Sequence, residues 1–221
     1  MINIKLAIFK LFKYRLLPII LHLLHDHENS RNRVSALEII TGLAFRFSKQ
    51  FLNGFVATDI DSLMQEKNNE VRKKAHQSFI ALLSLFDKKF VSKKFFGAVK
   101  RMAEDLNSDI RLIFADSICI FAKKLPFDVF ENEVLPKFIS HLDSKHRFIK
   151  EKSLTMLGNL ICTINEIFIR RKVTSEVQSR ERSSSKLIAI PNALYGSRTS
   201  STSQKGADEE DEFYLGLVYK Y

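Results

Sequence analysis

The sequence lacks tryptophan, and its 221 residues include only two cysteines, four prolines and seven glycines. So few prolines and glycines leave room for long helices, and nothing in the composition indicates a sheet. The cysteines, Cys119 and Cys162, belong to no Cys-x-x-Cys pair, which argues against a metal centre or a disulfide. We expect both to be buried, reduced thiols.

Catalytic motifs are also missing. There is no glycine-rich phosphate loop, no His-Glu-x-x-His motif, and no nucleophile with a base at a recognisable spacing. One cluster, His22, His25, Asp26 and His27, has zinc-ligand residue types. Histidines flanked by leucine at the end of an amphipathic helix are more typical of surface or half-buried positions. We therefore expect no enzymatic activity, no cofactor and no metal.

A long uninterrupted apolar run is absent as well. Residues 1–25 are rich in apolar side chains, but Lys5, Lys10, Lys13 and Arg15 interrupt them every few residues. A membrane span needs about 20 consecutive apolar residues. The sequence therefore predicts a soluble helix here, and we expect a cytoplasmic protein, with a nuclear location left open.

What the sequence does have is an ungapped internal repeat of 39 residues. Apolar side chains recur in register at this period, as they must when identical helical units stack and present the same ridge to each neighbour. The columns of the second helix are Ile40, Phe79, Ile118, Leu157; Leu43, Leu82, Phe121, Leu160; and Phe47, Phe86, Leu125, Ile164. Those of the first helix are Phe12, Phe51, Phe90, Val129; Leu17, Val56, Phe95, Val134; and Leu21, Ile60, Val99, Phe138.

The period divides the chain into units. An all-α solenoid is predicted over residues 1–177, followed by a low-complexity, disordered tail over 178–221. The solenoid has four full repeats and two partial ones, at 1–9, 12–48, 51–87, 90–125, 129–165 and 168–177. Because the chain begins in mid-repeat, we interpret it as a fragment or as a divergent cap. An acidic run over 208–212 precedes an aromatic segment, a candidate docking peptide.

Polar turns separate the two helices of each unit. They are expected at 27–32, 66–70, 105–109 and 144–147, where Asn and Asp can cap the helix that follows. An arginine opens the second helix at Arg33, Arg72 and Arg111, and Lys150 takes its place in the fourth unit.

Together, the period, a proline within the first helix and the Val/Ile-Arg pair that opens the second helix resemble the HEAT repeat. Pro18 and Pro136 provide the prolines, and Val71-Arg72 and Ile110-Arg111 provide the pairs. Within that family, the 39-residue unit is similar to the scaffold (A) subunit of protein phosphatase 2A and to related phosphatase regulatory subunits.

The resemblance implies a non-catalytic, protein-binding scaffold of a serine/threonine phosphatase. Its partners would be a phosphatase catalytic subunit and a variable regulatory subunit, contacted through the turns within the repeats. The residues expected to bind them are Glu66, Lys67, Asn69, Asp109, Lys145 and Arg147.

In the same family an acidic residue lies six positions before the arginine. Glu66 with Arg72 and Asp105 with Arg111 match this spacing, whereas His27 and Ser144 stand there in the other units. Such a pair lets a partly buried guanidinium bind a carboxylate and turn carbonyls. We expect a structural ladder made of Arg33, Arg72, Arg111, Lys150, Glu66 and Asp105.

Charge favours an alternative. Residues 1–173 carry 29 Lys and Arg and 18 Asp and Glu, a net charge of +11. The lysine pairs at 88–89, 93–94 and 123–124 could face phosphates or an acidic partner, as in a transport adaptor or a nucleic-acid-associated HEAT protein. Against nucleic acid, the phenylalanines lie on the predicted buried stripe rather than between the basic residues.

Overall fold

The computed structural model describes residues 12–187, with side chains from Tyr14 to Val177. Every regular element in that range is helical, which confirms the expected all-α class there. The chain divides into two compact units, Met1–Leu160 and Ile161–Tyr221. Each is described by itself below.

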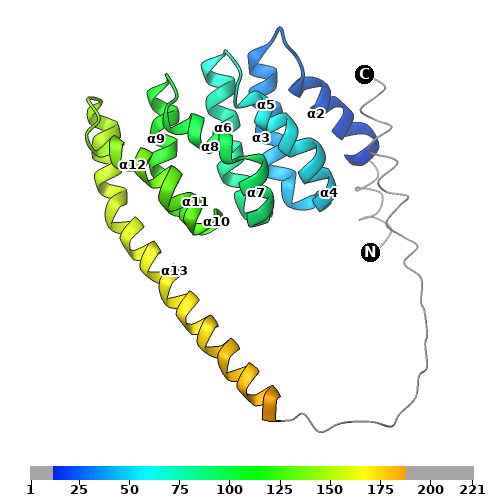
Figure 1. The fold of residues 1–221 in the computed structure, drawn as a ribbon. Coiled ribbons are helices and arrows are strands. Elements are labelled where there is room, and N and C mark those ends of the chain that lie inside the picture. Colours follow the sequence, from blue (N-terminus) through cyan, green and yellow to red (C-terminus); the bar gives the residue numbers. More distant parts are fainter. Residues whose placement is uncertain (1–11, 188–221) are drawn as a thin grey trace, which may run out of the picture. The chain divides into compact units, whose positions relative to one another are not determined.

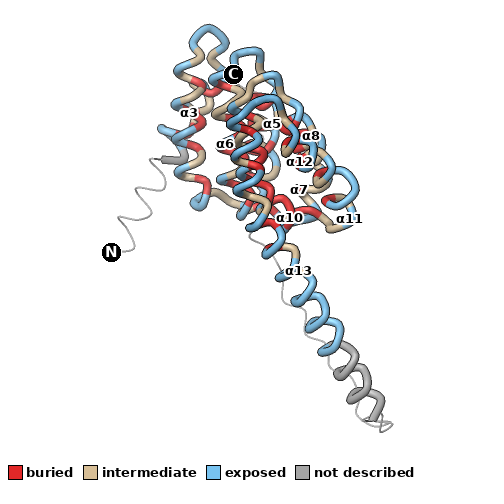
Figure 2. The backbone as a smooth tube through the Cα atoms, turned by 90° about the vertical axis from the view of Figure 1, so that its left-hand side faces the viewer, coloured by how far each residue is buried: buried red, intermediate tan, exposed pale blue. Residues whose placement is uncertain are grey.

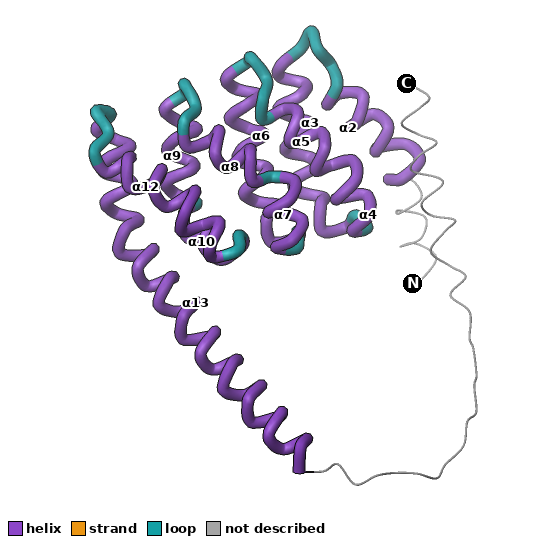
Figure 3. The backbone as a smooth tube through the Cα atoms, viewed as in Figure 1, coloured by secondary structure: helices purple, strands orange, loops and turns teal. Residues whose placement is uncertain are grey.

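The first unit consists of four helical hairpins in chain order (Figures 1 and 3). The bounds of the first two are η1 Phe12–Leu16, α2 Leu17–Leu24, α3 Ser30–Leu43 and η2 Ala44–Arg46, then α4 Lys49–Phe51, η3 Leu52–Val56, α5 Ala57–Leu63, α6 Asn69–Leu82 and η4 Leu83–Leu85. The others are α7 Lys88–Lys94, α8 Phe96–Ala103, α9 Ser108–Asp116 and α10 Ile118–Lys124, then α11 Phe127–Val129, η5 Phe130–Val134, α12 Leu135–Leu142 and the start of α13 Arg147–Leu187.

Packing within and between hairpins alternates along the chain. Helix α2 packs on α3, α5 on α6 and α8 on α9, while α3 packs on α6 and α6 on α9. The turns within the hairpins are gathered at one edge and the links between hairpins at the other (Figure 3). We call the first edge the turn edge; its loops are residues 25–29, 64–68, 104–107 and 143–146.

The first helix of each hairpin is irregular near its middle. A π-helical segment precedes α2, α5 and α12, and Phe95 breaks the helix between α7 and α8. Pro18 and Pro136 lie at the start of α2 and α12, where a missing backbone N–H interrupts the hydrogen-bond ladder. These breaks let each first helix bend over the apolar ridge that it covers.

The core lies between the two layers of helices (Figure 2). The predicted column at the middle of the first helix is buried in all four hairpins, at Leu17, Val56, Phe95 and Val134. In the predicted column of Leu43 on the second helices, Leu82, Phe121 and Leu160 are buried, and Leu43 is half-buried. The other predicted positions whose side chains are described are buried at Ile40, Phe51, Ile60, Phe79, Phe86, Val99, Ile118, Leu125 and Phe138, and half-buried at Leu21, Phe47, Phe90, Val129, Leu157 and Ile164.

The partly covered positions have a physical cause. Leu21, Leu43 and Phe47 belong to the first hairpin, which has a described neighbour on one side only. Leu157 belongs to the fourth hairpin, at the other end of the stack. In a stack, a position at an end unit can lose the part of its cover that a further neighbour would give. Phe90 and Val129 lie instead in the first turn after a link between hairpins, in α7 and α11.

Ion pairs join successive hairpins. They connect residues 33 to 40 positions apart, so each bridges one hairpin and the next. These pairs include Lys74 with Glu38 at 2.6 Å, Lys49 with Asp87 at 2.5 Å, Arg72 with Asp105 at 2.9 Å, Lys73 with Asp109 at 2.9 Å, Lys94 with Asp61 at 3.6 Å, Arg101 with Asp61 at 3.4 Å, Lys100 with Glu133 at 2.8 Å, Lys137 with Glu104, and Lys152 with Asp116 at 3.0 Å.

Helix α13 corrects one expectation. The sequence predicted a fourth repeat ending at 165, a new first helix over 168–177 and a tail from 178. Instead α13 is a single helix of 41 residues that continues to Leu187. Residues 159–187 contain neither proline nor glycine to end it, and the Arg, Lys and Glu there are good helix formers. The partial repeat over 1–9 and the tail beyond 187 lie outside the described residues.

The two cysteines also differ from expectation. Both are free, but Cys119 is half-buried and Cys162 is exposed. Each lies beside a core position on its helix rather than on it, so its thiol is only partly covered or left at the surface. Within residues 12–187, no helix combines the length and apolarity needed to cross a membrane.

Candidate functional site

The loops of the turn edge are built by local capping. In the first three hairpins Asn29, Asn68 and Asn107 precede the second helix, and each side-chain oxygen accepts a hydrogen bond from the backbone amide two residues on, at 2.8 to 3.0 Å. These bonds satisfy backbone donors that a helix start leaves free, so each asparagine fixes where its helix begins. In the fourth hairpin the Ser144 hydroxyl accepts from the His146 amide at 3.2 Å within the loop, as Asp105 accepts from the Asn107 amide in the third.

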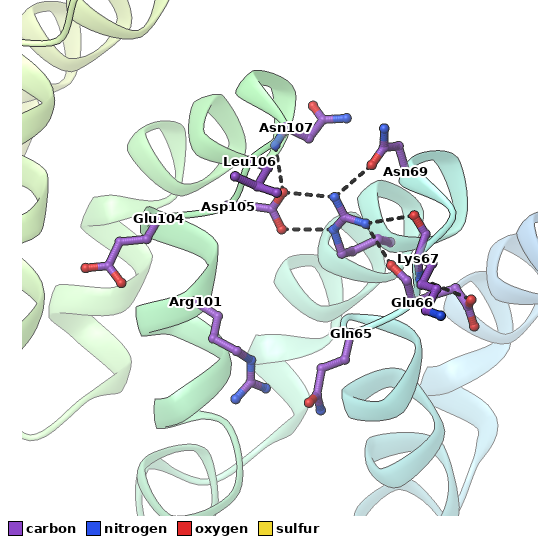
Figure 4. Close-up of a pocket in the computed structure, with 10 residues that line it drawn as sticks. Gln65, Glu66, Lys67, Asn69, Arg101, Glu104, Asp105, Leu106 and Asn107 are labelled. Atoms are coloured by element: carbon purple, nitrogen blue, oxygen red, sulfur yellow. Dashed lines mark hydrogen bonds and ion pairs between the residues drawn. The ribbon is translucent and has the colours of Figure 1, made fainter.

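Arg72 joins the second and third hairpins (Figure 4). Its Nε donates to Asp105 Oδ2 at 2.9 Å, and its Nη2 donates to Asp105 Oδ1 at 3.0 Å and to Asn69 Oδ1 at 2.8 Å. Its Nη1 donates to the carbonyls of Glu66 at 2.7 Å and Lys67 at 3.2 Å. Because a guanidinium has five N–H donors, all of them are used. Arg72 has none left for a ligand and acts as a structural joint.

The Arg72–Asp105 pair is well shielded. The two side chains are 13% and 11% exposed. Burial alone raises the pKa of Asp105, but the hydrogen bonds from Arg72 and the Asn107 amide and the charge of Arg72 outweigh it, so the pKa lies below its usual value. The carboxylate therefore stays ionised and keeps its bidentate bond with the guanidinium.

This geometry corrects the predicted ladder. The expected pairs, Glu66 with Arg72 and Asp105 with Arg111, do not form through carboxylates; the backbone carbonyls of Glu66 and Asp105 accept from those arginines instead. The Asp105 carboxylate turns to Arg72 of the preceding hairpin. The carbonyls at the end of a first helix point toward the helix that follows, whereas the side chain projects across the junction.

The other members of the ladder are less complete. Arg33 donates from Nη1 to the Asp26 carbonyl at 2.6 Å, and its Nε is buried without a partner. Arg111 donates from Nη1 to the carbonyls of Asp105 and Leu106. Lys150 is exposed, and its side chain forms no hydrogen bond or ion pair with the described residues, so the ladder does not continue into α13.

An open cleft of about 710 Å³ lies between the loops 64–68 and 104–107. It is walled by both loops, by the start of α6 and by the end of α8, with the Arg72–Asp105 joint between them (Figure 4). The lining residues are Gln65, Glu66, Lys67, Asn69, Arg72, Arg101, Glu104, Asp105, Leu106 and Asn107. Leu106 is 96% exposed at the tip of its loop, an apolar side chain with no cover in the described chain.

The structure brings together three of the six predicted partner-binding residues. Glu66, Lys67 and Asn69 line the cleft. The other three predicted residues are not among those that line the cleft. Asp109 pairs with Lys73, Lys145 is exposed on the fourth loop, and Arg147 donates to Glu151 at 2.6 Å.

Sequence reasoning missed part of the cleft. Gln65 and Glu104 come from the column that ends each first helix, which holds Asp26, Gln65, Glu104 and Asp143 and is polar in every hairpin. That recurrence was a usable signal. Arg101 and Leu106 carry none, because no other repeat has a similar residue at their positions.

The lysines lie mostly at the opposite edge. Of the predicted pairs, Lys94 approaches Asp61, and Lys124 donates to the Phe86 carbonyl at 3.1 Å and the Ser84 carbonyl at 3.3 Å. Lys88, Lys89 and Lys93, all on α7, are exposed and have no ion-pair partner among the described residues. We call these three the lysine cluster.

The histidine cluster does not assemble a metal site. His25 Nε2 lies 3.3 Å from Asp59 Oδ1, and this bond raises the pKa of His25. Over the described residues, no group of three or more His, Cys, Asp or Glu side chains is placed to hold a metal ion.

Comparison with known proteins gives a fold and no family. No family model matches the chain, and no curated protein matches it. Among solved structures, it is similar to the crystal structure of Cex1p, with a TM-score of 0.60 and 12% sequence identity. The match covers 71% of this chain and 30% of that chain, so it spans under a third of the length of Cex1p. At this identity the similarity concerns the fold alone.

Proposed function

We propose that the chain is a HEAT-repeat solenoid that acts as a non-catalytic protein-binding scaffold, with the turn edge as its binding surface. Two observations support the solenoid: the same columns are buried at intervals of 39 residues, and second helices pack on one another in chain order. In such an array each unit needs only its neighbours, which leaves both edges accessible to partners.

The observation that carries the proposal is that the cleft combines a structural ion pair with exposed side chains around it. Arg72 and Asp105 saturate each other and hold two loops in fixed register. Around them Lys67 and Asn69 are exposed, and Leu106 presents an uncovered apolar side chain. A rigid floor with a polar rim and an apolar anchor is the composition of a protein-binding surface.

The sequence resemblance to phosphatase scaffold subunits gives the partner to test first. The proposed role is that of a regulatory or scaffold subunit of a serine/threonine phosphatase, which holds the catalytic subunit and a variable regulatory subunit. The loops of the turn edge would make these contacts.

The lysine cluster favours a second candidate. Lys88 and Lys89 occupy the first turn of α7, where the helix dipole already places positive charge, and Lys93 follows Lys89 at the i+4 position. A polyanionic partner would relieve this repulsion. The alternative is therefore a transport adaptor or nucleic-acid-associated scaffold that binds through this surface.

A capture experiment separates the two candidates: the full chain is immobilised, and the amount of purified phosphatase catalytic subunit that it binds is measured. We expect Lys67→Glu with Asn69→Ala to lower capture at least tenfold, and the matched change Lys88→Glu with Lys89→Glu to leave it unchanged. Binding that depends on the lysine cluster and falls steeply between 50 and 200 mM salt would favour the alternative. Capture that survives both changes, with the helical circular dichroism intact, would contradict the assigned surface.

A further inference from the structure

Arg111 occupies the same repeat position as Arg72 and makes two of the five kinds of hydrogen bond that Arg72 makes. Its Nη1 donates to the carbonyls of Asp105 and Leu106, just as Arg72 Nη1 donates to those of Glu66 and Lys67. The other three bonds have no counterpart. The Nε and Nη2 of Arg72 hold Asp105, and its Nη2 also holds Asn69, whereas those of Arg111 hydrogen-bond nothing among the described residues.

The cause is the residue that the next hairpin supplies. Asp105 lies 33 positions after Arg72, and the residue 33 positions after Arg111 is Ser144. A serine hydroxyl is too short and has too few acceptors to bind both edges of a guanidinium. Arg111 holds the same two loop carbonyls as Arg72 does, so its Nε and Nη2 edge is expected to face the fourth hairpin as that of Arg72 faces the third.

No carboxylate in the surroundings pairs with Arg111. Glu104 is bound to Lys137, and Asp105 is bound to Arg72. Across the junction, the loop 143–146 carries one acidic residue, Asp143, and one lysine, Lys145. Asp143 forms no hydrogen bond or ion pair with Arg111 among the described residues.

We propose that the Nε and Nη2 edge of Arg111, at the junction of the third and fourth hairpins, is a binding site for a carboxylate of an acidic partner peptide. The peptide's Asp or Glu takes the place that Asp105 occupies on Arg72. The inference deepens the proposed function, since it gives the turn edge a charge requirement and rests on that edge being the binding surface.

The chemistry of the site fits this ligand. A half-buried guanidinium held from one side by two carbonyls is pre-oriented, so its open edge loses little side-chain entropy on binding. That edge presents two parallel N–H donors, the match for the two oxygens of a carboxylate. We call these two parallel donors of Arg111 the fork. A lysine at the same position would keep the positive charge but would lose the fork.

The first test lets the chain itself supply a carboxylate to Arg111. Ser144→Asp recreates the pair at Arg72, and it keeps the local hydrogen bond of the loop, because Asp105 Oδ1 accepts from the Asn107 amide at 2.8 Å as Ser144 accepts from His146. We expect the Tm of the full chain to rise by about 2–5 °C. The gain should vanish when Ser144→Asp is combined with Arg111→Lys. An unchanged Tm in the single variant would overturn the geometry.

The second test measures the ligand. A ten-residue polyglutamate peptide is titrated into the full chain while the Nε–H resonance of Arg111 is followed by NMR, with polyglutamine as the matched neutral control. We expect a saturable shift with polyglutamate only, and its loss in Arg111→Lys and in Ser144→Asp. A silent Arg111 signal, full affinity in Ser144→Asp, or a response to inorganic phosphate but not to the peptide would overturn the proposal.

The outcomes separate this inference from the proposed function. If capture of the phosphatase subunit depends on Lys67 and Asn69 while Arg111 does not respond to the acidic peptide, the carboxylate site at Arg111 is refuted and the scaffold role is kept. If Arg111 binds the peptide while changes at Lys67 and Asn69 do not alter capture, the cleft is refuted as the binding surface and the carboxylate site is kept.

Discussion

Two neighbouring junctions of the same stack differ in the residue that the next hairpin places opposite the arginine, and therefore in chemistry. At the second junction Arg72 is closed by Asp105, and all five of its donors are used. At the third, Arg111 keeps its carbonyl contacts but meets Ser144 and stays open. The role of a repeated residue is thus set by what the following unit supplies, and a structural joint and a candidate binding group can share one position in the repeat.

The comparison predicts unequal losses of stability. Arg72→Met leaves the shielded Asp105 carboxylate without its partner, so the free energy of unfolding should fall by about 3–5 kcal/mol. Arg111→Met removes two hydrogen bonds to carbonyls and should cost about 1–2 kcal/mol. Urea denaturation of both variants measures the difference. Equal losses would mean that the two junctions are alike.

A core change tests whether stability is higher in the middle of the stack than at its start. Leu82→Ala should cost about 2–5 kcal/mol, because Leu82 is buried between two neighbours and leaves a cavity. Leu43→Ala, at the equivalent but half-buried position, should cost less. The exposed control Lys88→Ala should stay within about 0.5 kcal/mol. A loss at Lys88 that matches the loss at Leu82 would refute the assigned faces.

Acid should weaken the second junction first through a histidine. His76 lies on α6 one turn after Arg72, and burial, followed by the nearby positive charges of Arg72 and Arg101 against the opposing charge of Asp105, lowers its pKa from 6.5 to about 4. A group with a depressed pKa in the folded state contributes stability above its unfolded pKa, and this is lost as the pH falls.

The stability of the protein should therefore decline between pH 6.5 and about 4, with a contribution from His76 of at most about 1.4 kcal/mol per pH unit. His76→Leu should flatten this slope, because it removes the imidazole that takes up the proton. The change breaks no hydrogen bond at Nδ1, which is buried without a partner. Asp105 acts in a lower window: its pKa is below 3.8, so its contribution is lost only as the pH falls through that folded value. Denaturation at pH 7, 5.5 and 4.5 checks the slope; an unchanged slope in His76→Leu would contradict it.

The smallest effect is expected at the lysine cluster. Lys89→Glu replaces an i,i+4 repulsion with Lys93 by an attraction and should stabilise α7 by a few tenths of a kcal/mol. Thermal denaturation at low and at 1 M salt checks this, because screening should erase the gain. A gain that persists at high salt would show that charge is not its cause.

Much of the fold could be predicted because its determinants are local or periodic. The column of Val56, Phe95 and Val134 is buried as expected, and Asn68 and Asn107 cap their helices. Spacing within one turn and a period of 39 residues are visible in the sequence alone. The length of α13 was missed because the low-complexity residues from 178 on were predicted to be disordered, although no proline or glycine interrupts the helix over 159–187.

The site was less predictable. Glu66, Lys67 and Asn69, which the sequence predicted as partner-binding residues, line the cleft together, but the carboxylate partner of Arg72 was assigned to its own hairpin. Which acid meets which arginine depends on the offset between stacked hairpins, which the sequence does not encode locally. The pairing at 33 residues, rather than six, follows only from the packed geometry.

A pair of double-mutant cycles tests the central claim most directly, with unfolding free energies of the single and double variants at each junction. The account predicts a coupling of about 1.5 kcal/mol or more between Arg72→Met and Asp105→Asn, since these residues share two charge-assisted hydrogen bonds, and a coupling near zero between Arg111→Met and Ser144→Ala. Additive effects at the junction of Arg72 and Asp105, or equal coupling at both junctions, would contradict it.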